Sequence, residues 1–429
     1  MNRFIALMVL MLWVIPLTGE AEDIIQKGEL LNLERCIETA LTRHPGILAA
    51  KNAANASESR IGQARAGYYP VIDWTTSASR TSVGPRQTLG FRTSSALFNS
   101  YSTGVTLNQN IYDFGKTSTQ VEIQRLNLDS SRSDLENVSD QVILNVKQAY
   151  FGVLQAKRNR TVAEEAVKQF QLHLEQAKGF YEVGTKPKFD VTKAEVDLSN
   201  AKLNLIRAEN ALRISVVNLN NAMGVPDAPE YTLEDTLSFQ KYEITFEDAL
   251  SRAYENRPDL KSVVARRQAA ESSIELAKRG YYPVLTGTAG YNYAGNDFPL
   301  ERGWNIGATL SFPIFSGFLT KYQVEEAKAN LNVLKANEES IRQTVFLEVQ
   351  QAFLNLKEAE ERIPTAELTV KQAEENFEIA TGRYAAGVGN PIEVTDAEVV
   401  LVNARTAYIQ ALYDYKVAKA SLEKAMGVR

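Results

Sequence analysis

Gly67-Tyr68-Tyr69-Pro70-Val71 is the most informative segment for the architecture, because it returns later in the chain as Gly280-Tyr281-Tyr282-Pro283-Val284. Each copy follows a segment rich in alanine and charged residues, and precedes a segment in which apolar and polar residues alternate. Alternation with a period of two indicates a β-strand, so the motif marks a change from helix to strand. We therefore predict two tandem units of one architecture, over residues 30–226 and 243–429, joined by a linker at residues 227–242.

Other repeated motifs support this duplication. The first unit ends in Ala222-Met223-Gly224-Val225 and the second in Ala425-Met426-Gly427-Val428. Near the start of each unit a helix is expected to begin at a proline, in His44-Pro45 and in Arg257-Pro258. Two segments that share these motifs are expected to share a shape. Each unit is thus predicted to hold a helix, one β-hairpin and two long helices.

The long helices are the dominant predicted elements. In the first unit we expect a hairpin over residues 69–113 and long helices over 116–181 and 188–223; in the second, a hairpin over 282–315 and long helices over 318–383 and 391–426. The first long helix of each unit has about 66 residues and would be roughly 100 Å long at ~1.5 Å per residue. In the last helix of each unit the apolar spacing alternates between three and four, which indicates a coiled-coil seam or the core stripe of a helical bundle.

The expected strands carry apolar residues on one face and short polar residues or glycine on the other. Trp304 and Ile306, for example, alternate with Asn305 and Gly307. A half-buried sheet of a water-soluble protein shows the same alternation, so the pattern alone leaves two alternatives open. In a membrane, however, four strands cannot close a barrel, and an open sheet edge in lipid is too costly. A membrane barrel would therefore need two copies of the chain, giving eight strands, or three copies, giving twelve.

Composition excludes several classes of protein. The chain has 429 residues, of which 44% are hydrophobic and 23% charged, with a net charge of −5 and a single cysteine. One cysteine excludes a disulfide scaffold, and the acidic balance argues against a nucleic-acid partner. Arg3 followed by an apolar run to Leu17 and a small-residue end indicates a secretory signal peptide over residues 1–21. The mature chain is therefore expected to be exported.

Two turn motifs and two strand-to-helix segments are the most specific features of the chain. The turns are Tyr181-Glu182-Val183-Gly184-Thr185 and Tyr384-Ala385-Ala386-Gly387-Val388, and the segments are Leu107–Gly115 and Leu310–Gly317. Together with the signal peptide and the duplication, they resemble the TolC-like outer-membrane efflux protein family over nearly all of residues 30–429.

This resemblance implies the fold, the location and the function. The fold would be mainly α with a small β portion: a trimeric α-barrel of long coiled-coil helices, continued by a membrane β-barrel with four strands per chain and twelve per trimer. The protein would lie in the outer membrane and extend into the periplasm. It would be the passive exit duct of a tripartite efflux or type I secretion system, with a periplasmic adaptor protein, an inner-membrane pump and outer-membrane lipid as partners. The cargo (drug, metal or protein) stays open.

The resemblance also implies site residues at the two turns. In the family this turn lies at the periplasmic tip, so Val183, Gly184, Thr185, Gly387 and Val388 are implied to contact the adaptor. The second copy departs from the Val-Gly-Thr form, which leaves its role open. A turn that only terminates a helix would use glycine in the same place.

An acidic ring at the channel entrance is implied at Glu393 and Asp396. These residues are three apart and so lie on one side of a helix. A trimer would bring six such carboxylates together, which favours cations; solvated surface carboxylates are the plain alternative. Tyr181 and Tyr384 are implied gate contacts, and Gly389 stands where some members carry a basic gate residue.

No catalytic or metal motif is found in the sequence. There is no glycine-rich phosphate loop after a strand and no metal-ligand spacing, so we expect no enzyme, cofactor or metal site. Four residues are interpreted as ordinary helix carboxylates: Asp190, Glu195, Asp396 and Glu398. His173 is interpreted as a solvent-facing residue and not a ligand. The alternative function from another class is an exported coiled-coil scaffold or adhesin without a channel.

Overall fold

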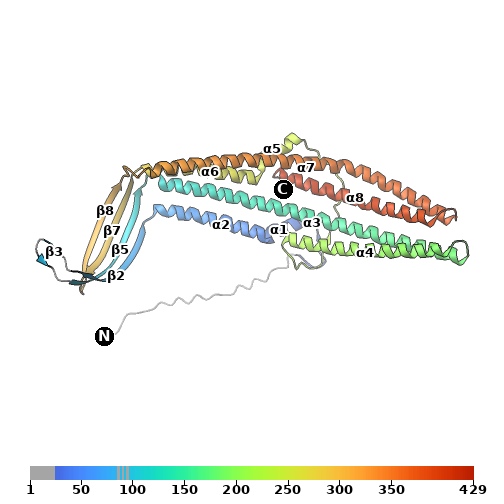
Figure 1. Ribbon diagram of the computed structural model, residues 1–429, viewed down its shortest axis with the longest axis horizontal. Helices are drawn as coiled ribbons and strands as arrows, with labels where there is room; N and C mark the ends of the chain where they lie inside the picture. Colours follow the sequence, from blue (N-terminus) through green and yellow to red (C-terminus); the bar gives the residue numbers. More distant parts are fainter. Residues whose placement is uncertain (1–24, 85–86, 89–90, 93–95) are drawn as a thin grey trace, which may run out of the picture.

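The protein is elongated, with a β-sheet at one end and long helices that run away from it (Figure 1). The computed structural model describes residues 25–84, 87–88, 91–92 and 96–429. The expected signal peptide at residues 1–21 lies outside these described residues. The expected class, mainly α with a small β portion, is confirmed.

The elements of the second half repeat those of the first in order, except that β3 and β4 have no counterpart among the described residues of the second half. The first half contains β1 (Leu30–Leu31), α1 (Leu33–Arg43), α2 (Pro45–Arg65), a 3-10 turn (Ala66–Tyr68), β2 (Val71–Val83), β3 (Gln87–Thr88), β4 (Phe91–Arg92), β5 (Ala96–Tyr112), α3 (Lys116–Glu182) and α4 (Lys188–Met223). The second half contains β6 (Thr232–Leu233), α5 (Phe246–Asn256), α6 (Pro258–Lys278), a 3-10 turn (Arg279–Tyr281), β7 (Val284–Gly295), β8 (Glu301–Ser311), α7 (Leu319–Ala385) and α8 (Pro391–Ala425). The first three helices of each half have 11, 21 and 67 residues in both copies.

The repeated sequence motifs meet each other in space. Gly224 ends α4 with a φ of +74°, and a Cβ there would lie 2.8 Å from Cα of His44, the residue that caps α2. Gly427 has a φ of +67°, and its Cβ would lie 2.9 Å from the backbone nitrogen of Arg257, at the start of α6. Only glycine tolerates both the positive φ and the close approach. The motif that ends each unit and the motif that opens its second helix are therefore two sides of one contact.

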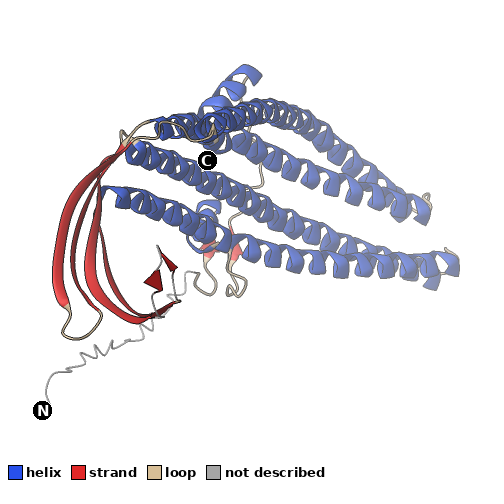
Figure 2. Cartoon of the chain, turned by 60° about the vertical axis from the view of Figure 1, so that its left-hand side comes forward, coloured by secondary structure: helices blue, strands red, loops and turns tan. Residues whose placement is uncertain are grey.

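The four long strands form one antiparallel sheet in the order β2-β5-β7-β8. Its register aligns one apolar row across all four strands, made of Trp74, Val105, Tyr291 and Trp304. The next row, on the opposite face, is made of Thr75, Gly104, Asn292 and Gly303. Figure 2 shows the sheet as a curved blade that projects from the helices. Within the described residues, the outer edges of β2 and β8 have no partner strand, so the sheet is open.

The helices pack lengthwise. α3 runs beside α4 and α7 beside α8, while α2 and α6 flank α3 and α7 nearer the sheet; α3 also contacts α8, which joins the two halves. Among the described residues, no helix is both long and apolar enough to cross a membrane.

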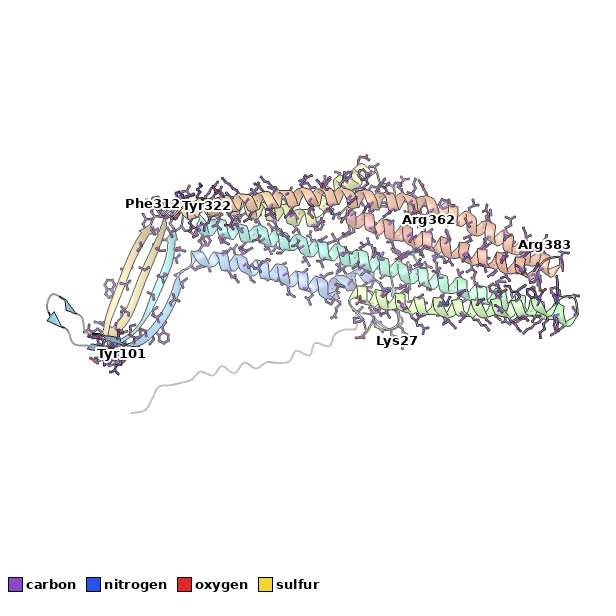
Figure 3. The ribbon with its side chains drawn as sticks, viewed as in Figure 1. Lys27, Tyr101, Phe312, Tyr322, Arg362 and Arg383 are labelled. Atoms are coloured by element: carbon purple, nitrogen blue, oxygen red, sulfur yellow. The ribbon has the colours of Figure 1, made fainter. Side chains whose placement is uncertain are left out.

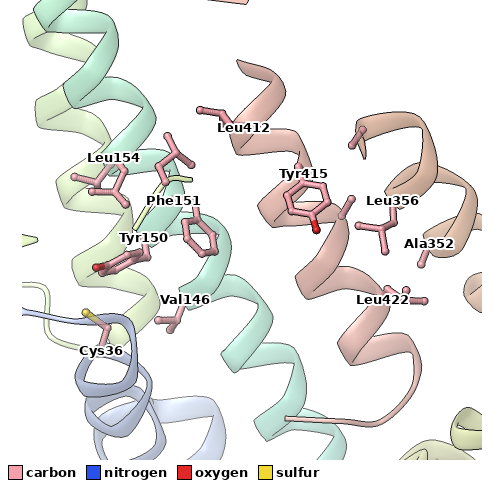
Figure 4. Packing of buried hydrophobic residues seen from close by; sticks show 14 of the residues in the cluster. Cys36, Val146, Tyr150, Phe151, Leu154, Ala352, Leu356, Leu412, Tyr415 and Leu422 are labelled. Atoms are coloured by element: carbon pink, nitrogen blue, oxygen red, sulfur yellow. The ribbon is translucent and has the colours of Figure 1, made fainter. Parts of the chain in front are cut away.

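Figure 4 shows part of the main hydrophobic core, to which α1, α3, α7 and α8 contribute buried side chains. Tyr150 and Tyr415 are fully buried there, and their hydroxyl groups donate to the carbonyl oxygens of Glu234 and Gln240, each over 2.6 Å. Both carbonyls belong to the segment between β6 and α5, which is thereby fixed to the bundle. The core sets the relative position of the two pairs of helices that continue to the tip.

Candidate functional site

The end of the molecule farthest from the sheet consists of two helical turns. Figure 3 marks Arg383 there, opposite Tyr101 in the sheet, while Phe312 and Tyr322 mark the junction of strands and helices. In the first turn Gly184 (φ +77°) donates its N–H to the carbonyl of Tyr181, and Thr185 donates to the carbonyl of Phe180. In the second turn Gly387 (φ +79°) and Val388 make the same two bonds to Tyr384 and Arg383. Both are Schellman motifs, in which glycine supplies the left-handed conformation.

The implied adaptor-contact residues all lie at the surface of this tip. Val183 and Val388 are 71% and 73% exposed, and Gly184, Thr185 and Gly387 are exposed as well. An exposed valine on each turn gives the tip two apolar contact points. Nothing lies within 4 Å of a Cβ built at either turn glycine, so their backbone conformation alone accounts for them.

The two implied gate tyrosines have different surroundings. Tyr181 is 46% exposed. Tyr384 is fully buried: its ring centroid lies 4.9 Å from that of His173 and 5.6 Å from that of Phe180, both on α3. Its hydroxyl has no hydrogen-bond partner within the described part of the chain. Burial raises the pKa of Tyr384, and the nearby carboxylate of Asp190 adds to the rise. Tyr384 therefore helps to pack the second helical hairpin, formed by α7 and α8, against the first, formed by α3 and α4.

The implied acidic residues lie on the exposed side of the first turns of α8. Asn390 caps this helix by accepting from the N–H of Ile392 over 3.0 Å, so Glu393 lies in its first turn. Glu393 and Asp396 are both exposed, and Glu393 forms an ion pair with Arg383 at 3.4 Å. Asp396 has no ion-pair partner within the part of the chain that the structure describes.

The basic groups of the tip come from positions that sequence reasoning did not single out. Gly389 is buried, and a Cβ there would lie 2.7 Å from the backbone nitrogen of Tyr384, so no side chain fits. Lys186, on the other turn, donates to the carbonyl of Gly389 over 3.3 Å and lies 5.7 Å from the ring centroid of Tyr384. Arg383 directly precedes Tyr384 in the sequence and faces the start of the next helix. This position is the sequence feature that could have identified it as a basic group of the tip.

Three interpretations from the sequence are wrong. His173 is only 6% exposed and does not face solvent, because the two hairpins pack over it. Burial lowers the pKa of His173, against the opposing effect of the Asp197 and Asp190 carboxylates. Asp190 and Glu398 are buried too, so they are not ordinary helix carboxylates, whereas Glu195 and Asp396 are exposed. Helical periodicity did not identify them because the contact between the two hairpins buries a second side of each helix.

A polar cluster joins the hairpins near the tip. Lys193 contacts both carboxylate oxygens of Asp197 at 2.6 and 2.7 Å, and the Thr395 hydroxyl of α8 donates to the same carboxylate of α4 over 2.8 Å. Because the Thr395 hydroxyl is buried, this bond ties one hairpin to the other. The described residues contain no group of three or more histidine, cysteine, aspartate or glutamate side chains placed to hold a metal ion.

The sequence pattern of the outer membrane efflux protein family matches residues 36–225 and 249–428. The chain belongs to this family. Among its relatives, the outer membrane protein TolC of Vibrio cholerae serotype O1 is 23% identical over 410 residues, which cover 92% of this chain and 90% of TolC. The cation efflux system protein CusC of Escherichia coli O157:H7 is 24% identical over 355 residues, covering 78% of this chain and 74% of CusC.

Solved structures of outer-membrane channels share the fold. A crystal structure of CusC has a TM-score of 0.81 at 20% identity and covers 94% of both chains. The open state of the Neisseria gonorrhoeae MtrE outer membrane channel has a TM-score of 0.76 at 19% identity, over 92% of this chain and 89% of MtrE.

As a member of the outer membrane efflux protein family, the protein is located in the outer membrane, extends into the periplasm and serves as an exit duct for efflux. The expected family, location and function are thereby confirmed, and the alternative of an exported scaffold or adhesin is set aside. Members of the family are channels, not enzymes.

Proposed function

We propose that three copies of the chain form the duct. The observation that carries this proposal is the open sheet, whose β2 and β8 edges lack partners within the described residues. An open edge in lipid would leave a row of backbone groups without hydrogen bonds, and pairing β8 of one copy with β2 of the next removes both edges. Three copies would give twelve strands, which is wide enough for an aqueous lumen. The apolar row with Trp74 and Trp304 would then face lipid, and the Thr, Asn and Gly row the lumen.

The tip is proposed to be the docking point of a periplasmic adaptor that links the duct to an inner-membrane pump. Val183 and Val388 are the exposed apolar residues of the two turns, and each lies next to a glycine that fixes the shape of its turn. Small rigid turns with an apolar side chain suit insertion into a groove of a partner. Gly184, Thr185 and Gly387 would supply the surrounding backbone contacts.

Glu393 and Asp396 are proposed to form the selective constriction. Threefold symmetry would bring six carboxylates to one level of the lumen, three of them also paired with Arg383. A ring of like charge concentrates cations and disfavours anions. Relatives of similar identity are named for different cargo, cation efflux at 24% and toluene efflux at 21%, which supports a duct whose cargo is chosen by the pump.

The test is a planar-bilayer measurement on the purified protein. The double variant Glu393→Gln with Asp396→Asn removes the charges and keeps the shape. We expect a severalfold drop in the cation-to-anion permeability ratio, read from the reversal potential in a salt gradient. Glu195→Gln, on an exposed glutamate of the first hairpin, is the matched control and should leave the ratio unchanged.

Two results would contradict the proposal. An unchanged permeability ratio in the double variant would show that Glu393 and Asp396 do not form the constriction. A monomer in mild detergent, detected by native mass spectrometry, would contradict the proposed trimer.

A further inference from the structure

Glu398 is a buried carboxylate without a partner among the residues that the structure describes. It lies on α8, is 4% exposed, and none of those residues forms a hydrogen bond with its buried Oε2 atom. Leaving a buried charged group unsatisfied costs several kcal/mol in general. Burial accordingly raises the pKa of Glu398 to about 7, with a further rise from Glu165 and a partial offset from Arg405.

This carboxylate lines a pocket where the two hairpins meet. The pocket has a volume of about 450 Å³ and is formed by α3, α7 and α8. Its apolar wall consists of Val162, Ala166, Phe377, Leu401 and Val402. Pockets of this size hold a single drug-sized molecule, and the other residues that line this one are charged or polar.

The pocket has an excess of negative charge. The charged groups that line it from the three helices are Glu165 and Lys168 of α3, Glu374 and Glu378 of α7, and Glu398 and Arg405 of α8. Four carboxylates thus face two cations. Arg405 is already engaged, at 2.7 Å to Glu165 and 2.9 Å to Glu374, and forms no ion pair with Glu398.

We propose that this pocket binds a small organic amine with an apolar body, whose ammonium group pairs with Glu398. The ammonium would pair with the Glu398 carboxylate in the wall of the pocket, and the body would pack against the apolar residues. Phe377 adds a ring face that attracts a cation. The site is separate from the proposed acidic constriction and does not depend on the proposed docking of an adaptor.

The duplication supplies the matched control. Glu195 occupies the position in the first hairpin that Glu398 occupies in the second, but it is exposed and lies 3.9 Å from Lys178. It does not line the pocket. Glu195→Gln therefore removes the same charge at the repeated position without touching the proposed site.

The probe is dansylcadaverine, a fluorescent primary amine with an apolar ring system, and its neutral N-acetyl derivative is the reference compound. Both are titrated at pH 8 into the full-length protein held in amphipol. We expect saturable binding of the amine, weakened about tenfold or more by Glu398→Gln. Glu195→Gln should bind like the unaltered protein, and the acetylated compound should bind like the amine does to Glu398→Gln.

The pH dependence is a second, independent readout. The amine pairs with the ionised carboxylate, and with a pKa of about 7 the ionised fraction falls about tenfold between pH 8 and pH 6. We expect affinity to fall by about the same factor in the unaltered protein and to stay flat in Glu398→Gln. Equal affinity of the two proteins at pH 8, or equal binding of the acetylated compound to the unaltered protein, overturns the proposal.

Discussion

The two hairpins that end at the tip have the same backbone and different surroundings. Both close in a Schellman turn, yet Tyr181 is exposed while Tyr384, its counterpart, is fully buried. Lys186 in the first turn has its counterpart in the buried Gly389 of the second. The second hairpin inserts its tyrosine, and the first supplies the site that receives it.

The difference follows from how tandem copies pack. Two copies side by side in the same direction touch through unlike faces, so one copy offers the protruding group and the other the recess. Such a contact repeats around a ring if the rotation closes. In a ring of three chains, the exposed Tyr181 would be available to the second hairpin of the neighbouring copy. The residues of each helical hairpin then fit the particular hairpin that packs against it.

The sharpest test of this difference compares Tyr384→Ala with Tyr181→Ala. Removing the buried ring of Tyr384 should destabilise the contact between the helical hairpins by about 3–5 kcal/mol. Removing the exposed ring of Tyr181 should destabilise the same contact within one chain by less than about 0.5 kcal/mol. Hydrogen exchange of the last turns of α7 and α3 measures both. Equal protection in the two variants would show that the hairpins are not distinguished by this side chain.

A second test uses the buried and exposed glutamates. The pKa of Glu398 is raised from 4.5 to about 7. Its protonation therefore contributes its full amount to the free energy of unfolding below about pH 4.5, and this contribution is lost as the pH rises through 7. Above that pH the cost is roughly 3 kcal/mol at 1.36 kcal/mol per pKa unit. Glu398→Gln should therefore raise the thermal midpoint at pH 8 and change it little at pH 4.5.

The control for this test is Glu195→Gln, whose midpoint should follow the unaltered protein throughout. A Glu398→Gln protein that loses stability at pH 8 would mean that the carboxylate has a partner in the assembled protein.

The smallest effect is expected at the exposed ion pair of Arg383 and Glu393. Arg383→Gln should change stability by less than about 1 kcal/mol, because exposed ion pairs contribute little. It frees the Glu393 charge, so cation preference in a bilayer should rise slightly, and high salt should abolish the rise. A large loss of stability would show that this pair also joins the two hairpins.

Much of the fold was predictable from repetition. Gly67-Tyr68-Tyr69-Pro70-Val71 and its copy mark the change from helix to strand, and the alternation around Trp304 and Ile306 indicates strands with two unlike faces. These signals are local, because the hydrophobic period, a turn or a helix cap depends on residues that are neighbours in the sequence. The class of the protein followed from them together with the family resemblance.

The environment of the site residues was not predictable in the same way. His173, Asp190 and Glu398 have helical neighbours typical of a solvated face, and they are buried only because a second hairpin lies against them. That contact joins residues about two hundred positions apart, such as Thr395 and Asp197. Periodicity describes one helix at a time, so it identifies the main stripe of each helix and misses a second contact surface.

The equal lengths of α3 and α7, 67 residues each, have a consequence for how such a duct can change in size. Each of these two helices runs unbroken from the sheet to the tip, a distance of roughly 100 Å at ~1.5 Å per residue. Together they set the distance between the sheet and the tip. An insertion in one alone would put the two turns at different heights and separate Tyr384 from its recess. Seven residues added to both, and to the helices beside them, would lengthen the duct by about 10 Å and keep every side chain close to its present face.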